Sequence, residues 1–355
     1  MSKSSTRASK RTDRPGTVEM DPSVVLSVRD LSVNFVTKRG IETALQNVSL
    51  DVPRGANLGL VGESGCGKST FLKAAIGVLA PNAIVPSGRV IHAGVDLLAA
   101  DPEEARQVRW RDISMITQSA LNALDPVHRV GDQIVEAVRA HSKVSRKAAR
   151  EQAKEMLSIV GVDPNRIDEF PHQFSGGMRQ RAIIAMALML RPELVLADEP
   201  TTSLDVIVQD QIFRRVRELQ DELGFSMLLV THDLGLVIEN CARIAVMYSG
   251  QIVEEGQTSD VVSAPFHPYT LGLKNSLPRL DRDIEPISIH GGPPDPAVQH
   301  HGCRFVYRCP FAVDACHTVV PELRPVASGH KAACHRVEDV PGLREKAAQY
   351  ETWSP

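Results

Sequence analysis

Long apolar segments are missing from this sequence of 355 residues. The longest uninterrupted apolar run covers residues 182–190 and is bounded by Arg181 and Arg191. A membrane-spanning helix needs about 20 apolar residues. We therefore expect a buried helix at this run, and no crossing of a membrane by the chain itself. The chain could still lie against a membrane by binding a membrane-embedded partner.

A strong excess of charge is also missing. The chain has 40 Lys and Arg against 43 Asp and Glu, a net charge of -3, which gives no reason to expect nucleic acid as the main partner. Positive charge gathers only within residues 1–23, among Ser, Thr and Gly. This stretch lacks the apolar core and cleavage site of a secretory signal, so we expect a disordered basic tail.

Cysteine is sparse over most of the chain and crowded at its end. Cys66 and Cys241 stand alone, and the other four of the six lie in the last fifth. Without an export signal we expect a reducing compartment, which favours metal binding over disulfides for this group. The four are Cys303, Cys309, Cys316 and Cys334.

The pattern of apolar residues predicts an α/β fold. Short apolar runs at 58–61, 195–197 and 226–230 are typical of buried strands, and a helical pattern at 206–223 separates the last two. Strand-helix-strand alternation predicts a parallel sheet covered by helices. Apolar and polar residues alternate over 24–35, which predicts a further strand with one exposed face.

Three more segments complete the expected organisation. Helical periodicity dominates from about 106 to 191, which predicts a helical subdomain inserted in a larger α/β domain of residues 24–265. Residues 244–248 and 251–254 predict a hairpin that turns at Ser249-Gly250. Beyond Pro265 the composition shifts to Pro, His and Cys, which predicts a separate C-terminal module at 266–355.

One glycine-rich segment matches the phosphate-binding loop pattern, with a strand before it and a helix after it. The glycines let backbone N–H groups close around phosphates, and the start of the helix adds a favourable dipole. Lys68 is expected to reach the β- and γ-phosphates of a nucleotide, and Ser69 to bind Mg²⁺. The segment reads Gly62-Glu63-Ser64-Gly65-Cys66-Gly67-Lys68-Ser69.

A second segment supplies carboxylates. The apolar run 194–197 ends in Asp198 and Glu199. Asp198, at the end of a buried strand, is expected to enter the magnesium shell. Glu199 can polarise an attacking water as general base. Between the two segments, Ser175 is a good helix N-cap before two glycines, which leaves an anion site at a helix start.

Taken together, these motifs resemble the nucleotide-binding subunit of an ABC transporter, over residues 24–264. By that resemblance Ser175–Gly177 is the signature loop, which contacts the γ-phosphate held by an opposing subunit. In the motif Ser203-Leu204-Asp205, Asp205 is expected at the dimer seam, and His232 is expected to hold the γ-phosphate and water. The resemblance implies nucleotide contacts by Phe35, Gly62, Ser64, Gly65, Cys66, Gly67, Lys68, Ser69, Thr70, Ser175, Gly176, Gly177 and Asp205, and magnesium contacts by Ser69, Gln118 and Asp198. Glu199, His232 and Gln118 form the implied catalytic set, and Gln118 also couples the site to a membrane partner.

The signature departs from the commonest form, because Phe174 and Met178 replace Leu and Gln. This form resembles the D-type ATPase subunits of dipeptide and oligopeptide importers. The tail motifs of that subfamily follow as His267-Pro268-Tyr269-Thr270, Ser276-Leu277-Pro278 and Gly291-Gly292-Pro293-Pro294.

The resemblance also implies partners and a place. These are two multi-span permease subunits, a second ATPase chain of a different, F-type kind, and an external substrate-binding protein. The assembly lies at the cytoplasmic face of the cell membrane.

Nickel, glutathione and oligosaccharide uptake stay open as alternatives to peptide uptake. A soluble ABC ATPase of repair or translation is disfavoured, since the chain has no long coiled coil and one motor copy. A metal- or redox-sensing protein with a vestigial motor is disfavoured by the intact motifs.

The four clustered cysteines are separated by five, six and seventeen residues. Four thiolates in about thirty residues can close around one metal centre, but no gap has the two-residue spacing of a zinc ribbon. The resemblance implies a [4Fe-4S] cluster, with zinc and unligated cysteines as alternatives. His301, His317 or His335 could replace one ligand.

Overall fold

The computed structural model describes residues 19–118, 123–202, 204–277, 286–298 and 300–353. Most of the expected basic tail, together with Ser203 and Pro278, lies outside these ranges. No helix in the described part of the chain is long and apolar enough to cross a membrane. The expected buried helix at 182–190 is confirmed for most of its length, because α6 (Gly176–Leu188) buries seven of its residues.

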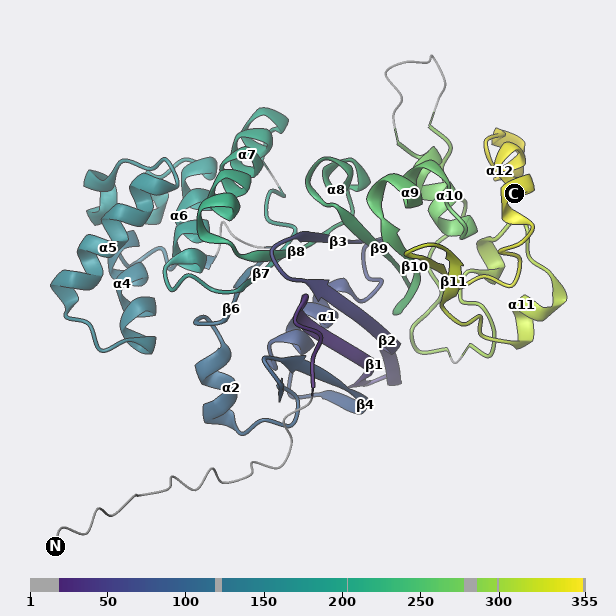
Figure 1. The fold of residues 1–355 in the computed structure, drawn as a ribbon, viewed down its shortest axis with the longest axis horizontal. Coiled ribbons are helices and arrows are strands. Elements are labelled where there is room, and N and C mark those ends of the chain that lie inside the picture. Colours follow the sequence, from purple (N-terminus) through teal and green to yellow (C-terminus); the bar gives the residue numbers. More distant parts are fainter. Residues whose placement is uncertain (1–18, 119–122, 203, 278–285, 299, 354–355) are drawn as a thin grey trace, which may run out of the picture.

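The main sheet of the described chain has the strand order β11-β12-β10-β9-β3-β8-β7-β6 (Figure 1). Its central part is parallel, with β3 between β8 and β9, and β7 between β8 and β6. The predicted parallel sheet is thus confirmed. The strands are β3 (Asn57–Val61), β6 (Ile113–Ile116), β7 (Leu194–Asp198), β8 (Ser226–Thr231), β9 (Arg243–Tyr248), β10 (Gln251–Gln257), β11 (Arg324–Ala327) and β12 (His330–Ala332).

A smaller antiparallel sheet packs against this one, with the order β2-β1-β4-β5. It gathers on one side of the main sheet in Figure 1, with α1 between the two. The strand expected at 24–35 is β1, and its long partner β2 had no counterpart in the sequence pattern. The strands are β1 (Val24–Thr37), β2 (Gly40–Pro53), β4 (Ala83–His92) and β5 (Val95–Asp96).

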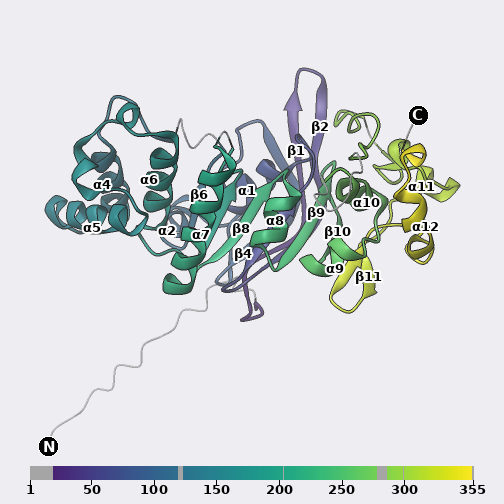
Figure 2. The same cartoon turned by 90° about the horizontal axis from the view of Figure 1, so that it is seen from above.

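Helices cover both faces of the main sheet and extend beyond its ends. Figures 1 and 2 both place α4 and α5 at one end of the molecule and α11 and α12 at the other. The helices are α1 (Lys68–Ala75), α2 (Pro102–Val108), α4 (Val130–His141), α5 (Arg146–Ile159), α6, α7 (Val206–Leu223), α8 (Leu234–Asn240), α9 (Thr258–Ser263), α10 (Pro268–Asn275), α11 (Asp314–Thr318) and α12 (Val340–Ala347), with 3₁₀ turns at Pro164–Asp168, Pro171–Gln173, Val306–Arg308 and Tyr350–Thr352.

The core is divided by the main sheet. Alternate residues of a strand point to opposite faces, and in β7 Leu194 and Leu196 join the cluster around α1 and the antiparallel sheet. Val195 and Ala197 join the other cluster, which contains the helices from α4 to α8. This anchoring on both faces fixes the end of β7, where Asp198 stands.

The segment expected to be helical, 106–191, contains one strand of the main sheet. β6 pairs in parallel with β7, Ile113 opposite Leu194 and Ile116 opposite Ala197. The pattern missed it because a short, fully buried apolar run cannot be distinguished from a piece of buried helix by periodicity. Helix α7 has the bounds that the pattern predicts. The hairpin is present with Ser249 and Gly250 at positive φ in its turn, but β9 begins one residue earlier and β10 ends three residues later than predicted.

The C-terminal segment packs directly on the main fold. β12 pairs with β10, Glu254 opposite Ala332, and so extends the main sheet. Phe305, Val340 and Trp353 belong to the same apolar cluster as the helices from α4 to α8. The shift to Pro, His and Cys could not indicate this, because composition does not say which sheet edge a later strand will join.

Candidate active site

The glycine-rich loop 62–67 connects β3 to α1, as the sequence predicts. Gly65 and Gly67 have φ of 79° and 109°, conformations that glycine adopts without strain. A side chain at Gly67 is also excluded by space, because a Cβ there would lie 2.7 Å from the carbonyl oxygen of Ala44. No side chain caps the N-terminus of α1. Its first N–H groups therefore remain open to an anion.

A cavity of about 540 Å³ opens beside this loop. Its volume is suited to a small organic ligand. It brings together nine residues that the sequence predicts as site residues: Phe35, Ser64, Gly65, Gly67, Lys68, Ser69, Thr70, Gln118 and Glu199. Gly62 and Cys66 belong to the loop but do not line the cavity, and a Cβ on Gly62 would meet Cys66 Sγ at 2.8 Å.

Lys68 is the cation of the loop. Its Nζ donates to the carbonyl oxygens of Gly62, at 2.6 Å, and Glu63, at 2.9 Å. Burial raises the pKa of the neighbouring Cys66 thiol, although Lys68 acts in the opposite direction. Cys66 therefore stays protonated near neutral pH, which argues against a reactive role.

Ser69 and Asp198 meet at the floor of the site. Burial raises the pKa of the Asp198 carboxyl, and the hydrogen bond from the Ser69 hydroxyl opposes this shift. A serine hydroxyl in contact with a carboxylate is an oxygen donor set of the kind that Mg²⁺ prefers. The two residues predicted to bind magnesium from separate motifs are therefore adjacent.

Glu199 is the centre of a hydrogen-bond network. Gln118 Nε2 and Thr202 Oγ1 donate to Glu199 Oε2 at 2.9 Å and 3.0 Å, and His232 Nδ1 lies 2.9 Å from Glu199 Oε1. Burial tends to raise the pKa of Glu199, but the hydrogen bonds of His232 and Thr202, with Lys68 nearby, hold it below its ordinary value. An ionised carboxylate at neutral pH can accept a proton from water.

The backbone of Glu199 is strained. Its φ is +45°, in a region that costs a non-glycine residue free energy and that is enriched at functional sites. The Glu199 N–H donates to the Val230 carbonyl at 2.8 Å, which ties this residue to β8. The geometry thus turns the carboxylate away from β7 and toward Gln118.

The signature residues lie apart from this cavity. Ser175 caps α6 through a hydrogen bond from the Met178 N–H at 3.3 Å, and Asp205 caps α7 through one from Val208 at 2.9 Å. Neither residue, nor Gly176 or Gly177, lines the cavity. The first residues of α7, Val206 and Ile207, are apolar yet 79% and 71% exposed.

The four clustered cysteines converge on one small cavity of about 20 Å³, shared with His335 and Phe311. All four are free thiols. Burial raises the pKa of Cys303 to about 11, of Cys309 to about 12 and of Cys334 to about 11. Three of the sulfurs also accept hydrogen bonds from backbone N–H groups, those of Phe305 and Val306, of Phe311 and of Arg336.

A compact metal-ion site is not formed there. Among the described residues, no three His, Cys, Asp or Glu are placed to hold a metal ion. Four sulfurs around one Zn²⁺, at about 2.3 Å from the metal, would have to lie within about 4 Å of one another. Of the three histidines named as substitute ligands, His335 directs Nε2 to the Val319 carbonyl at 2.8 Å.

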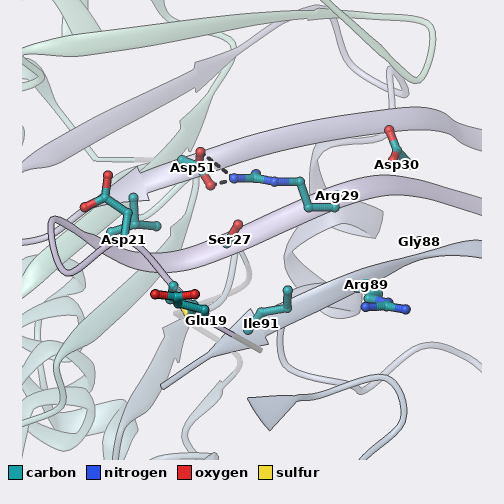
Figure 3. A pocket seen from close by; sticks show the side chains of 11 residues that line it. Glu19, Asp21, Ser27, Arg29, Asp30, Asp51, Gly88, Arg89 and Ile91 are labelled. Carbon is teal, nitrogen blue, oxygen red and sulfur yellow. Dashed lines mark hydrogen bonds and ion pairs between the residues drawn. The ribbon is translucent and has the colours of Figure 1, made fainter. Parts of the chain in front are cut away.

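A hollow of similar size lies elsewhere, on the antiparallel sheet (Figure 3). Arg29 there is paired with Asp51 at 2.7 Å. Four carboxylates line this hollow against two guanidinium groups: Glu19, Asp21, Asp30 and Asp51 against Arg29 and Arg89. The negative surplus is unsuited to a polyphosphate, so the loop cavity is the candidate nucleotide site.

Sequence patterns missed several residues around the site. Arg308 forms two hydrogen bonds with the Glu63 carboxylate, at 2.8 Å and 3.0 Å. The hydroxyl of Tyr269 accepts from the Glu63 N–H at 2.9 Å. Residues 293–296 line the loop cavity. The only sequence signal was that these residues fall in or beside the tail motifs.

Comparison with known proteins places the chain. The model of the family described as "ABC transporter" matches residues 45–202, and that of "Oligopeptide/dipeptide transporter, C-terminal region" matches residues 253–316. The dipeptide transport ATP-binding protein DppD of Bacillus subtilis (strain 168) is 45% identical over 314 residues, which cover 87% of this chain and 94% of the relative. This chain belongs to the dipeptide/oligopeptide family of ABC transporter ATP-binding proteins. It is an ABC-type ATPase.

Other relatives support the same family. A probable peptide ABC transporter ATP-binding protein of Sinorhizobium fredii is 45% identical over 90% of this chain and 97% of its own length. The oligopeptide transport ATP-binding protein OppD of Salmonella typhimurium is 41% identical over 88% of this chain and 94% of its own. A solved dimeric ATP-binding cassette in a post-hydrolysis state with ADP and Pi matches with a TM-score of 0.59 and 26% identity, over 66% of this chain and 98% of the cassette.

Proposed function

We propose that this chain is the ATP-hydrolysing subunit of an importer for dipeptides or oligopeptides. The observation that carries the proposal is the ionised Glu199 carboxylate beside the phosphate loop, held by Gln118, Thr202 and His232. The relatives named for dipeptide and oligopeptide transport supply the cargo class. ATP would bind with its phosphates on the loop 62–67 and its adenine against Phe35.

Each residue of the site has a defined task in this proposal. Ser69 and Asp198 hold Mg²⁺, which neutralises phosphate charge when it is bound. Lys68 turns from its carbonyl partners to the β- and γ-phosphates. Glu199 accepts a proton from the attacking water, and its network with His232 holds the carboxylate at the required angle.

A second motor subunit completes the site. Ser175 and the two glycines after it lie outside the cavity of their own chain, so in this proposal they serve the partner's ATP. The exposed Val206 and Ile207 beside Asp205 provide apolar surface for the seam. A solved cassette that matches this chain is dimeric. Following the sequence resemblance, the partner is a different, F-type chain.

The coupled assembly also contains two multi-span permease subunits and an external substrate-binding protein, and this chain lies at the cytoplasmic face of the membrane. Gln118 is the residue through which the site senses the permeases. Closure of the motor dimer and its reopening after hydrolysis would then alternate the access of a substrate path.

The cysteine set is proposed to hold a [4Fe-4S] cluster. Four free thiols around one cavity, with backbone N–H groups directed at three sulfurs, form the kind of environment that such clusters use. Anaerobically purified protein should show visible absorption that dithionite bleaches, and Cys309→Ser should lose it. A colourless protein without iron would contradict this part.

The proposal as a whole is tested by co-purification. Affinity capture of this chain from its native membrane should recover two permease subunits and a second ATPase. Recovery of the chain alone, or with nucleic-acid-processing proteins, would contradict it. Uptake measurements with labelled peptide, nickel, glutathione and an oligosaccharide then separate the cargo alternatives.

A further inference from the structure

The C-terminal segment 293–296, here called the proline segment, lines the same cavity as the phosphate loop 62–67. It reads Pro293-Pro294-Asp295-Pro296, and all four residues face the same 540 Å³ cavity as Phe35 and Lys68. The phosphate loop lies more than 220 residues earlier in the chain. The proline segment thus forms one wall of the nucleotide cavity, although it lies outside the phosphate-binding motif.

The position of the segment along the cavity is defined by β2. In the antiparallel pairing of β1 and β2, Phe35 lies opposite Glu42. The next residue, Thr43, donates its N–H to the carbonyl oxygen of Pro296 at 3.0 Å. The proline segment therefore lies along the edge of β2 that is not paired with β1, and it lines the same cavity as Phe35.

The segment is held at both ends. At its C-terminal end Asp295 is paired with Arg39, in the turn between β1 and β2, and accepts from the Ala297 N–H at 3.0 Å. On its N-terminal side the carbonyl of His290 accepts from Arg308 Nε at 3.0 Å. Anchors on both sides keep the prolines in place before a ligand arrives, which lowers the entropy cost of binding.

We propose that the proline segment binds the nucleoside end of ATP, with Pro293 and Pro294 on the face of the base opposite Phe35. The loop 62–67 is expected to hold the phosphates, so a different part of the cavity must receive the base. Proline rings are compact, apolar and fixed in φ, and they can cover a purine face without loss of side-chain entropy. This inference rests on the proposed function, since it assigns a part of the same ATP site.

The test compares ATP with inorganic tripolyphosphate, which has no base. Dissociation constants are measured by calorimetry on the full chain with Mg²⁺ present. A Pro293→Ala/Pro294→Ala variant should bind ATP about tenfold more weakly and tripolyphosphate as the wild type does. The KM for ATP should rise by the same factor while kcat at saturating ATP is unchanged. Pro325→Ala, at an exposed proline of β11 outside the cavity, is the matched control and should change nothing.

A second variant separates base contact from a general loss of shape. Phe35→Ala should weaken ATP selectively, and in the triple variant the losses should not add, because both walls serve one base. Equal weakening of ATP and tripolyphosphate, or unchanged ATP binding in the proline variant, would overturn the inference. A wild-type chain that binds neither compound would instead refute the proposed function, so the two failures are distinguishable.

Discussion

Replacement of Arg308 by methionine tests whether the C-terminal segment supports the phosphate loop. The guanidinium group is 8% exposed and pairs in a bidentate manner with Glu63, which is 26% exposed. It also donates to the Tyr248 hydroxyl at 3.2 Å. Met keeps much of the apolar volume but leaves the Glu63 carboxylate half-buried and without its cation.

The expected loss follows from this burial. Removal of one partner from a buried ion pair costs about 3–5 kcal/mol, and the partial exposure of Glu63 indicates the lower end, about 3 kcal/mol. At about 2 °C per kcal/mol for a chain of this size, the midpoint of thermal unfolding should fall by about 6 °C. The uncompensated negative charge next to the loop should also weaken ATP binding, because it repels the phosphates.

Calorimetric unfolding of four proteins measures the effect: the wild type, Arg308→Met, Glu63→Gln and the double variant. The double variant should recover part of the loss, since a neutral amide without a partner costs less than a charge. Arg324→Met removes a pair with Glu338 whose side chains are 50% and 71% exposed, and it should leave the midpoint within about 1 °C. Equal shifts for Arg308→Met and Arg324→Met would refute the reasoning.

Three further changes have defined outcomes. Glu199→Gln should lower ATP turnover at least about a hundredfold while ATP still binds, and near-normal hydrolysis would sink the general-base assignment. Gly67→Ala should abolish ATP binding in a filter assay, because its Cβ meets the Ala44 carbonyl at 2.7 Å and φ is 109°. Burial lowers the pKa of His267 to about 3, so below pH 6.5 the unfolded chain binds a proton that the folded chain does not. Stability should therefore fall as pH drops from about 6.5 toward 4, by about 1.4 kcal/mol per pH unit from this group. In urea titrations His267→Asn, which can still accept the Tyr269 N–H, should lack this component, and equal slopes would contradict the assignment.

Most residues of the site could be predicted from the sequence, because they belong to short contiguous motifs. The loop 62–67 and the pair Asp198-Glu199 are each contiguous, and each follows a strand that apolar periodicity predicts. Short-range patterns report such features well, because the strand, the turn and the functional residue are neighbours in the chain. The contact of Ser69 with Asp198 followed once both strands were placed in one parallel sheet.

Long-range contacts were outside the reach of the pattern. Gln118 and His232 reach Glu199 from positions 81 and 33 residues away in the chain, and only the family resemblance pointed to them. Arg308 and Glu63 are 245 residues apart, with no periodicity to connect them. β12 joins β10 by backbone hydrogen bonds, which depend little on side-chain identity. The same holds for the bond between Thr43 and Pro296.

The central claim, ATP hydrolysis coupled to peptide import, is tested most directly by uptake into proteoliposomes. The vesicles contain this chain, its second ATPase and the two permease subunits, with Mg-ATP inside and binding protein with labelled dipeptide outside. The account predicts ATP-dependent accumulation of the peptide that Glu199→Gln in this chain abolishes. Hydrolysis at the wild-type rate without peptide entry, or entry that Glu199→Gln leaves unchanged, would contradict it.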